Sequence, residues 1–174
     1  MRRTGTTPDP ETPTRRGLAA LGEVACRYRA DEIPPEDLPM VAAEALVAGL
    51  DTPTLCELAG LPRNADVADI RHAFEQALAE CGIELPDPDL ARRHALRRLA
   101  AGLLAGEIEP ADLATDDWWE EGTETAQERA FARLIPPCAC CPEYATGLEM
   151  RRRAAELRAA ALALTSSAPV APGC

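Results

Sequence analysis

Three cysteines stand within four residues of one another in a proline-bounded loop. The sequence PPCACCP runs from 136 to 142 and places its thiols at Cys138, Cys140 and Cys141. Thiolates bind soft ions such as Zn²⁺ or Cu(I), and a lowered pKa would also make them reactive. A structural zinc site needs four donors. The fourth could come from Cys81, Cys174, His72 or His94. The alternative, a connector whose cysteines only pack, is favoured because one couplet alone does not make a zinc site.

Both tryptophans of the chain stand side by side among carboxylates. The segment 107–124 holds eight acidic residues and no basic one, and its centre is formed by Asp116, Asp117, Trp118, Trp119, Glu120 and Glu121. Adjacent helical residues point about 100° apart, so both rings are not expected on one buried face. Because exposed tryptophan is common at binding hot spots, the segment predicts contact with a basic partner surface. The alternative is that one tryptophan closes the core and the other covers it.

The sequence LCELAGLPRNADVADIRHAF at 55–74 resembles a helix-turn-helix, the motif that places a helix in the DNA major groove. The second helix, however, carries Asp66, Asp69 and Glu75, which phosphates repel. A regulator of the helix-turn-helix type is therefore kept only as an alternative function, and nucleic acid is not an expected partner.

Arginines cluster at two places, and His72 and His94 stand alone on separate expected helices. The first cluster consists of Arg92, Arg93, Arg97 and Arg98, and the second spans 151–153. We expect both clusters to face solvent and to pair with nearby carboxylates. The alternative for the first is a docking place for a phosphate or an acidic peptide.

The composition excludes several enzyme mechanisms. The 174 residues include no lysine, and serine occurs only as Ser166 and Ser167. A phosphate-loop lysine and a Schiff-base lysine are therefore impossible, and a serine nucleophile is not expected. The net charge of −11 disfavours phosphate backbones and anionic lipids. No apolar run reaches the roughly 20 residues of a membrane helix, so the chain is expected in the cytoplasm, with its seven cysteines reduced.

The hydrophobic pattern predicts an all-α fold, a compact bundle of seven to eight helices. Alanine and leucine dominate, aromatic residues make up only 3%, and no stretch alternates as a strand would. Capping residues and glycines bound the helices. These are expected near 17–30, 36–50, 53–60, 66–82 and 88–106, after Thr123, and after Thr146. We predict disordered tails at 1–15 and 166–174 and a single helical domain over 16–165, with a possible seam near 82–88.

Residues of about 36–110 resemble uncharacterised small helical proteins of GC-rich actinobacteria. The resemblance rests on LPMVAAEALVAGLDTPTLCELAGLPR, FEQALAECGIELP and LRRLAAGLLAGEIEP. It implies an actinobacterial source and a helical fold, and no functional residue follows from it.

The function that the sequence favours is a non-enzymatic, acidic protein-interaction module, of the immunity, antitoxin or adaptor kind. Its partner would be another protein with a basic surface, and no cofactor is expected unless the cysteine loop holds Zn²⁺. A metal-binding or thiol-reactive protein is the first alternative.

Overall fold

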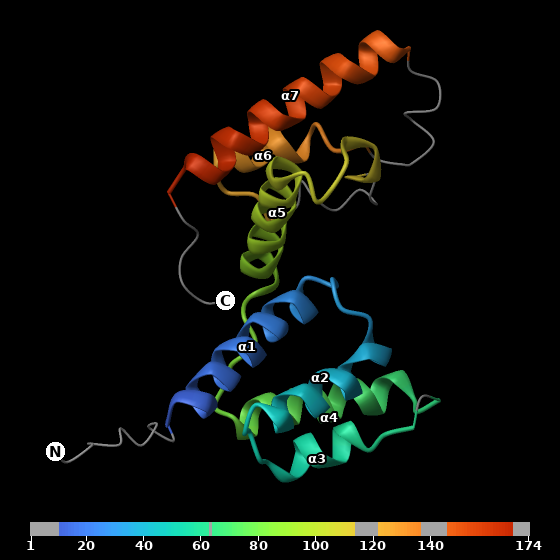
Figure 1. Ribbon diagram of the computed structural model, residues 1–174, viewed down its shortest axis with the longest axis vertical. Coiled ribbons are helices and arrows are strands. Elements are labelled where there is room, and N and C mark those ends of the chain that lie inside the picture. The colour runs from blue at the N-terminus through green and yellow to red at the C-terminus, as the bar shows by residue number, and fades with distance from the viewer. Residues whose placement is uncertain (1–10, 63, 114–121, 137–145, 169–174) are drawn as a thin grey trace, which may run out of the picture. The chain divides into compact units, whose positions relative to one another are not determined.

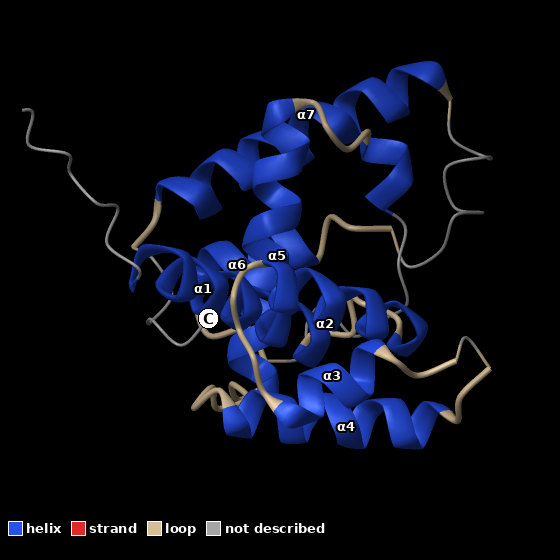
Figure 2. Ribbon diagram, turned by 60° about the horizontal axis from the view of Figure 1, so that its bottom comes forward, coloured by secondary structure: helices blue, strands red, loops and turns tan. Residues whose placement is uncertain are grey.

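In the computed structural model of the chain, the structure describes residues 11–62, 64–113, 122–136 and 146–168. Within these ranges every regular element is a helix, and Figure 2 shows only helices joined by loops. The predicted all-α class is confirmed. The α-helices are α1 (Glu11–Arg29), α2 (Leu38–Val47), α3 (Pro53–Ala59), α4 (Val67–Glu80), α5 (Pro88–Ala105), α6 (Ala126–Ala132) and α7 (Gly147–Ser166). Two 3₁₀ helices, η1 (Pro35–Asp37) and η2 (Pro110–Leu113), precede α2 and follow α5.

The described helices form two compact units. Helices α1 to α4 make the N-terminal unit and α5 to α7 make the C-terminal unit, with the division between Pro86 and Asp87. A new helix begins directly after this division, because Asp87 caps α5 and Pro88 takes its first position.

Short-range capping bonds set most helix starts where the sequence predicts them. The side chains of Thr52, Asp66 and Thr146 accept hydrogen bonds from backbone N–H groups at the starts of α3, α4 and α7. The predicted cap at Thr123 is wrong. Thr125 caps α6 instead, because Glu128 stands three residues further on and completes a capping box with it.

Helix α1 starts at Glu11, earlier than the expected 17. Pro13 is compatible with this start because the first four N–H groups of an α-helix have no partner within the helix. The predicted tail at 1–15 therefore overlaps the first turns of α1.

The N-terminal unit consists of helices α1 to α4 (Figure 1), and small and branched side chains form its core. The core residues are Leu21, Ala25, Leu38, Ala42, Ala45, Leu50, Leu55, Leu58, Ile70, Phe74, Ala77 and Leu78. Tyr28 meets Phe74 edge-on, with ring centroids 4.9 Å apart. The many alanines let helix backbones approach closely, so a core with few aromatic rings still excludes water.

In the C-terminal unit, α7 packs against α5 and α6 (Figure 1). Its buried side chains are Leu157, Ala161 and Leu164, all in its second half. Phe131 of α6 and Leu103 of α5 are also buried. The sequence predicts that Met150 begins the buried stripe of α7, but Met150 is exposed. The first half of α7 contributes no buried side chain.

Candidate functional site

A groove of about 560 Å³ opens on the N-terminal unit, where η1 and α2 lie beside the connection from α3 to α4. Its lining includes Glu36, Asp37, Met40, Ala43, Leu61 and Ile70. Most of these side chains are apolar, and the two carboxylates come from η1. An open apolar groove with a few charged groups is a usual form of a binding site.

The phase of α2 brings Met40 to the groove. Leu38, Ala42 and Ala45 are buried and share the inner face of the helix. Met40 falls on the opposite face at 3.6 residues per turn and is 64% exposed. The neighbouring Ile70 is only 3% exposed, so the groove has a packed wall from α4.

The apolar surface continues along the outer face of α2. Val47 follows Met40 by one heptad and is 91% exposed, and Ala43 lies between them on the same face. We call Met40, Ala43 and Val47 the α2 stripe. Single exposed apolar residues are ordinary on protein surfaces. A row of them that runs out of a groove is more typical of an interaction surface.

The groove lies in an acidic part of the chain. Between Asp31 and Pro86 there are twelve carboxylate residues and two arginines. Glu36, Asp37 and Glu44 are exposed beside the α2 stripe. This field attracts cationic groups and repels nucleic acids and anionic lipid headgroups.

A carboxylate also joins α3 to α4 within this unit. Glu80 of α4 accepts hydrogen bonds from the hydroxyl and the backbone N–H of Thr54, which is 3% exposed. The hydroxyl bond from Thr54 is the main reason that the pKa of Glu80 is lowered. Glu80 therefore holds together the helix pair that resembles a helix-turn-helix. Asp66 caps the second helix and Asp69 lies in its first turn, and both are exposed. These carboxylates would repel the phosphates of DNA.

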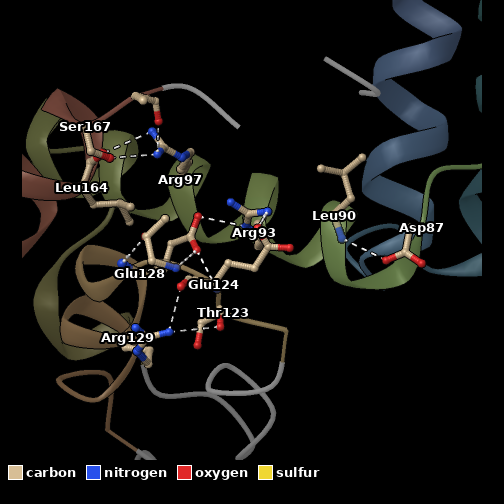
Figure 3. A network of polar contacts seen from close by, with 12 residues as sticks. Asp87, Leu90, Arg93, Arg97, Thr123, Glu124, Glu128, Arg129, Leu164 and Ser167 are labelled. Atoms are coloured by element: carbon tan, nitrogen blue, oxygen red, sulfur yellow. Dashed lines mark hydrogen bonds and ion pairs between the residues drawn. The ribbon is translucent and has the colours of Figure 1, made fainter. Parts of the chain in front are cut away.

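The C-terminal unit contains a buried ionic network (Figure 3). Glu128 of α6 is completely buried. One of its oxygens accepts a bond from Arg93 Nε at 3.0 Å, and the other accepts bonds from the backbone N–H groups of Glu124 and Thr125, both at 3.0 Å. Arg93 also pairs with the exposed carboxylate of Glu124. This network ties α5 to the start of α6.

The electrostatics of Glu128 follow from these partners. Burial by itself raises the pKa of the carboxyl group, but the N–H groups of Thr125 and Glu124 and the guanidinium of Arg93 together lower it below the ordinary value. Glu128 therefore stays ionised and fully bonded, as a structural anion.

Arg97, one turn further along α5, has a similar structural role. Its guanidinium donates to the carbonyl oxygens of Leu164 and Ala168 and to the hydroxyl of Ser167, and so satisfies the end of α7 (Figure 3). The prediction that Arg93 and Arg97 belong to a solvated face is wrong. Both guanidinium groups reach partners more than thirty residues away in the sequence. The periodicity of a single helix cannot predict such contacts.

The two sites predicted from sequence lie outside the described residues. The partner-binding segment, Asp116 to Glu121, falls within 114–121, and the metal ligands Cys138, Cys140 and Cys141 fall within 137–145. In the part of the chain that is described, no group of three or more His, Cys, Asp or Glu side chains is arranged to hold a metal ion.

The described cysteines differ from one another. Cys56 and Cys81 are free thiols, Cys56 exposed and Cys81 partly buried. Burial and the charge of Glu80 raise the pKa of Cys81. Cys26 is buried and disulfide-bonded, so the expectation that all cysteines are reduced is wrong for this residue.

Sequence reasoning missed the groove, although one signal for it was present. The spacing of Leu38, Ala42 and Ala45 fixes the inner face of α2, and this spacing alone places Met40 and Val47 outside. That Leu61 comes to lie beside Met40 depends on how α3 and α4 fold back, which no local pattern reveals.

No protein-family model, curated protein or solved structure matches this chain. The resemblance to actinobacterial helical proteins therefore stays a prediction. Among the described helices, none combines the length and the apolar character needed to cross a membrane.

Proposed function

We propose that this chain is a non-enzymatic protein-interaction module and that the groove beside the α2 stripe is its binding site. The observation that carries the proposal is the exposure of Met40 and Val47 on one helix face, in continuity with an apolar groove and beside the carboxylates of Glu36 and Asp37. A partner with apolar side chains next to cationic ones suits this chemistry.

Three carboxylates with a perturbed pKa have structural roles. Glu80, Glu128 and Glu149 have a lowered pKa, and each accepts hydrogen bonds that cap or join helices. Catalytic acids and bases usually have a pKa moved toward the working pH. These three groups are moved away from it, so their bonds serve the fold.

The acidic tryptophan segment remains a second predicted contact element. Its sequence places the two aromatic residues Trp118 and Trp119 among carboxylates, which suits a basic partner surface. No observation on the described residues favours the metal or thiol alternative.

Site-specific photocrosslinking tests the proposal. The photoreactive residue p-benzoylphenylalanine replaces Met40 in the groove, and in a matched control it replaces Leu104, an exposed leucine of α5. In an extract of the producing cells, we expect a discrete crosslinked species from position 40 that an excess of unlabelled chain suppresses. Equal crosslinking from both positions, or none from position 40, would contradict the proposal.

A further inference from the structure

Among the described residues, helix α7 carries a second exposed apolar row, in the C-terminal unit. Leu148, Ala155 and Leu162 follow one another at heptad spacing, and all three are exposed, with Leu148 at 71% and Leu162 at 59%. We call these residues the α7 stripe. They lie on the side of the helix opposite to Leu157 and Leu164, which face the core.

The charges beside the α7 stripe are opposite to those beside the α2 stripe. Arg151, Arg152 and Arg158 are exposed and lie within about one turn of the apolar row. In the N-terminal unit the charged neighbours of the α2 stripe are carboxylates: Glu44 on α2 itself, and Glu36 and Asp37 in η1 just before it. The segment 146–168 carries four arginines and two glutamates, whereas 31–86 is strongly acidic.

We propose that a second copy of this chain is the occupant of the groove, and that it docks its α7 stripe against the α2 stripe. The inference rests on the proposed function and names its partner. Both stripes repeat at seven residues, about 10.5 Å along a helix, so their side chains can interdigitate over the length of α2. The flanking arginines then face Glu36, Asp37 and Glu44.

Each chain carries both surfaces, the groove and the α7 stripe. An exchange of these surfaces between two chains makes two equal contacts related by a two-fold axis, and a head-to-tail arrangement of the same contact makes a longer oligomer. A single contact between short helices is small and weak, and two of them acting together raise the apparent affinity.

Sedimentation equilibrium of the full chain tests the inference directly. Up to about 200 μM chain at about 0.05 M salt, we expect reversible association to a mass of at least two chains. Raising the salt to about 0.5 M shortens the screening length and should weaken the association at least about fivefold. A mass of one chain under all these conditions overturns the inference.

Charge reversal identifies the surfaces. The first variant carries Glu36→Arg and Glu44→Arg, and the second carries Arg151→Glu and Arg158→Glu. Each variant alone should associate about tenfold more weakly or worse, because like charges then face each other. An equimolar mixture should recover association, because every contact in the mixed pair again joins opposite charges.

Matched controls carry the same change of charge on other exposed positions. Glu57→Arg with Glu84→Arg replaces the first pair, and Arg15→Glu with Arg16→Glu replaces the second. We expect both controls to associate as the unmodified chain does. If the controls weaken association as much as the variants, or if the mixture fails to recover it, net charge or another surface is responsible and the inference is wrong.

The two proposals fail in different ways. A crosslink from position 40 to a different protein, with a monomeric chain in the centrifuge, supports the proposed function and overturns self-docking. If position 40 gives no crosslink in the extract and the purified chain stays monomeric, both proposals fall. A crosslink to a second copy, with charge-dependent association, supports both.

Discussion

Replacing Glu128 with alanine should destabilise the chain strongly, although this residue has no part in the proposed binding surface. The carboxylate is completely buried and accepts three hydrogen bonds, one of them from Arg93. Its loss leaves the N–H groups of Glu124 and Thr125 without that acceptor. Among the described residues, Arg93, which is 13% exposed, then keeps its ion pair with the exposed carboxylate of Glu124. Breaking a buried ion pair by removing one partner costs about 3–5 kcal/mol.

The lower part of that range is expected, because Arg93 keeps one anionic neighbour. We predict a loss of about 3–4 kcal/mol in the free energy of unfolding, a large share of the total of about 5–15 kcal/mol that is common for natural domains. Glu124→Ala is the matched control. It removes the other carboxylate on the same arginine, but that carboxylate is 69% exposed, so the loss should stay below about 1 kcal/mol.

Urea unfolding followed by circular dichroism gives both values, and hydrogen exchange of peptides from α6 shows whether the loss is local. The pH dependence of stability gives a second measurement, made on Glu128→Gln, which removes the charge of the side chain and keeps its size. Because the folded-state pKa of Glu128 lies below its ordinary 4.5, its stabilising effect is present above that pH and is lost as the pH falls through the folded-state pKa. The stability difference between the chain and Glu128→Gln should therefore shrink in acid. If Glu128→Ala costs no more than Glu124→Ala, the view that this buried anion joins α5 to α6 is refuted.

Three further predictions concern single positions. Burial and a hydrogen-bonded carboxylate raise the pKa of Tyr28 to about 12. The stability that its neutral phenol contributes is therefore present below pH 10 and is lost as the pH rises toward 12. Ultraviolet titration of the chain, compared with Tyr28→Phe, should show a phenol that ionises near this high pH. Gly106 has a φ of +76° and Gly22 lies within α1, and an added Cβ would meet no atom within 4 Å at either position. In urea unfolding, Gly106→Ala should therefore destabilise the chain by about 1 kcal/mol, because of its left-handed backbone, and Gly22→Ala should stabilise it by up to about 1 kcal/mol. If both substitutions changed the free energy of unfolding in the same direction, backbone conformation would not be the cause. Iodoacetamide should alkylate the exposed Cys56 well before Cys81, whose pKa is raised, and peptide mass spectrometry that finds the reverse order would show that exposure does not control their reactivity.

The helical elements could be predicted from sequence because their determinants are local. The caps at Thr52, Asp66, Asp87 and Thr146 each bind an N–H two or three residues away, a distance that a sequence pattern spans. The error at Thr123 has the same origin. Thr123 and Thr125 can both cap by residue type, but only Thr125 stands three residues before a glutamate and so forms the capping box.

The roles of the charged residues could not be predicted in this way. Arg93 and Arg97 occur in a run of arginines that is typical of a solvated face, yet each finds its partners 31 to 71 residues away. Whether an arginine is solvated or internal depends on which helix covers it. That choice is made by the packing of α6 and α7 against α5.

The sequence by itself determined that this chain is helical and acidic and where most of its helices begin, because hydrogen bonds within one turn and the spacing of apolar residues are local properties. Only the tertiary structure decided which charges are internal, as with Glu128, and which apolar residues are exposed beside a groove, as with Met40. Burial and partner choice arise when segments far apart in the chain come together, and the free energy of a charged or apolar side chain depends on that environment more than on its neighbours in sequence.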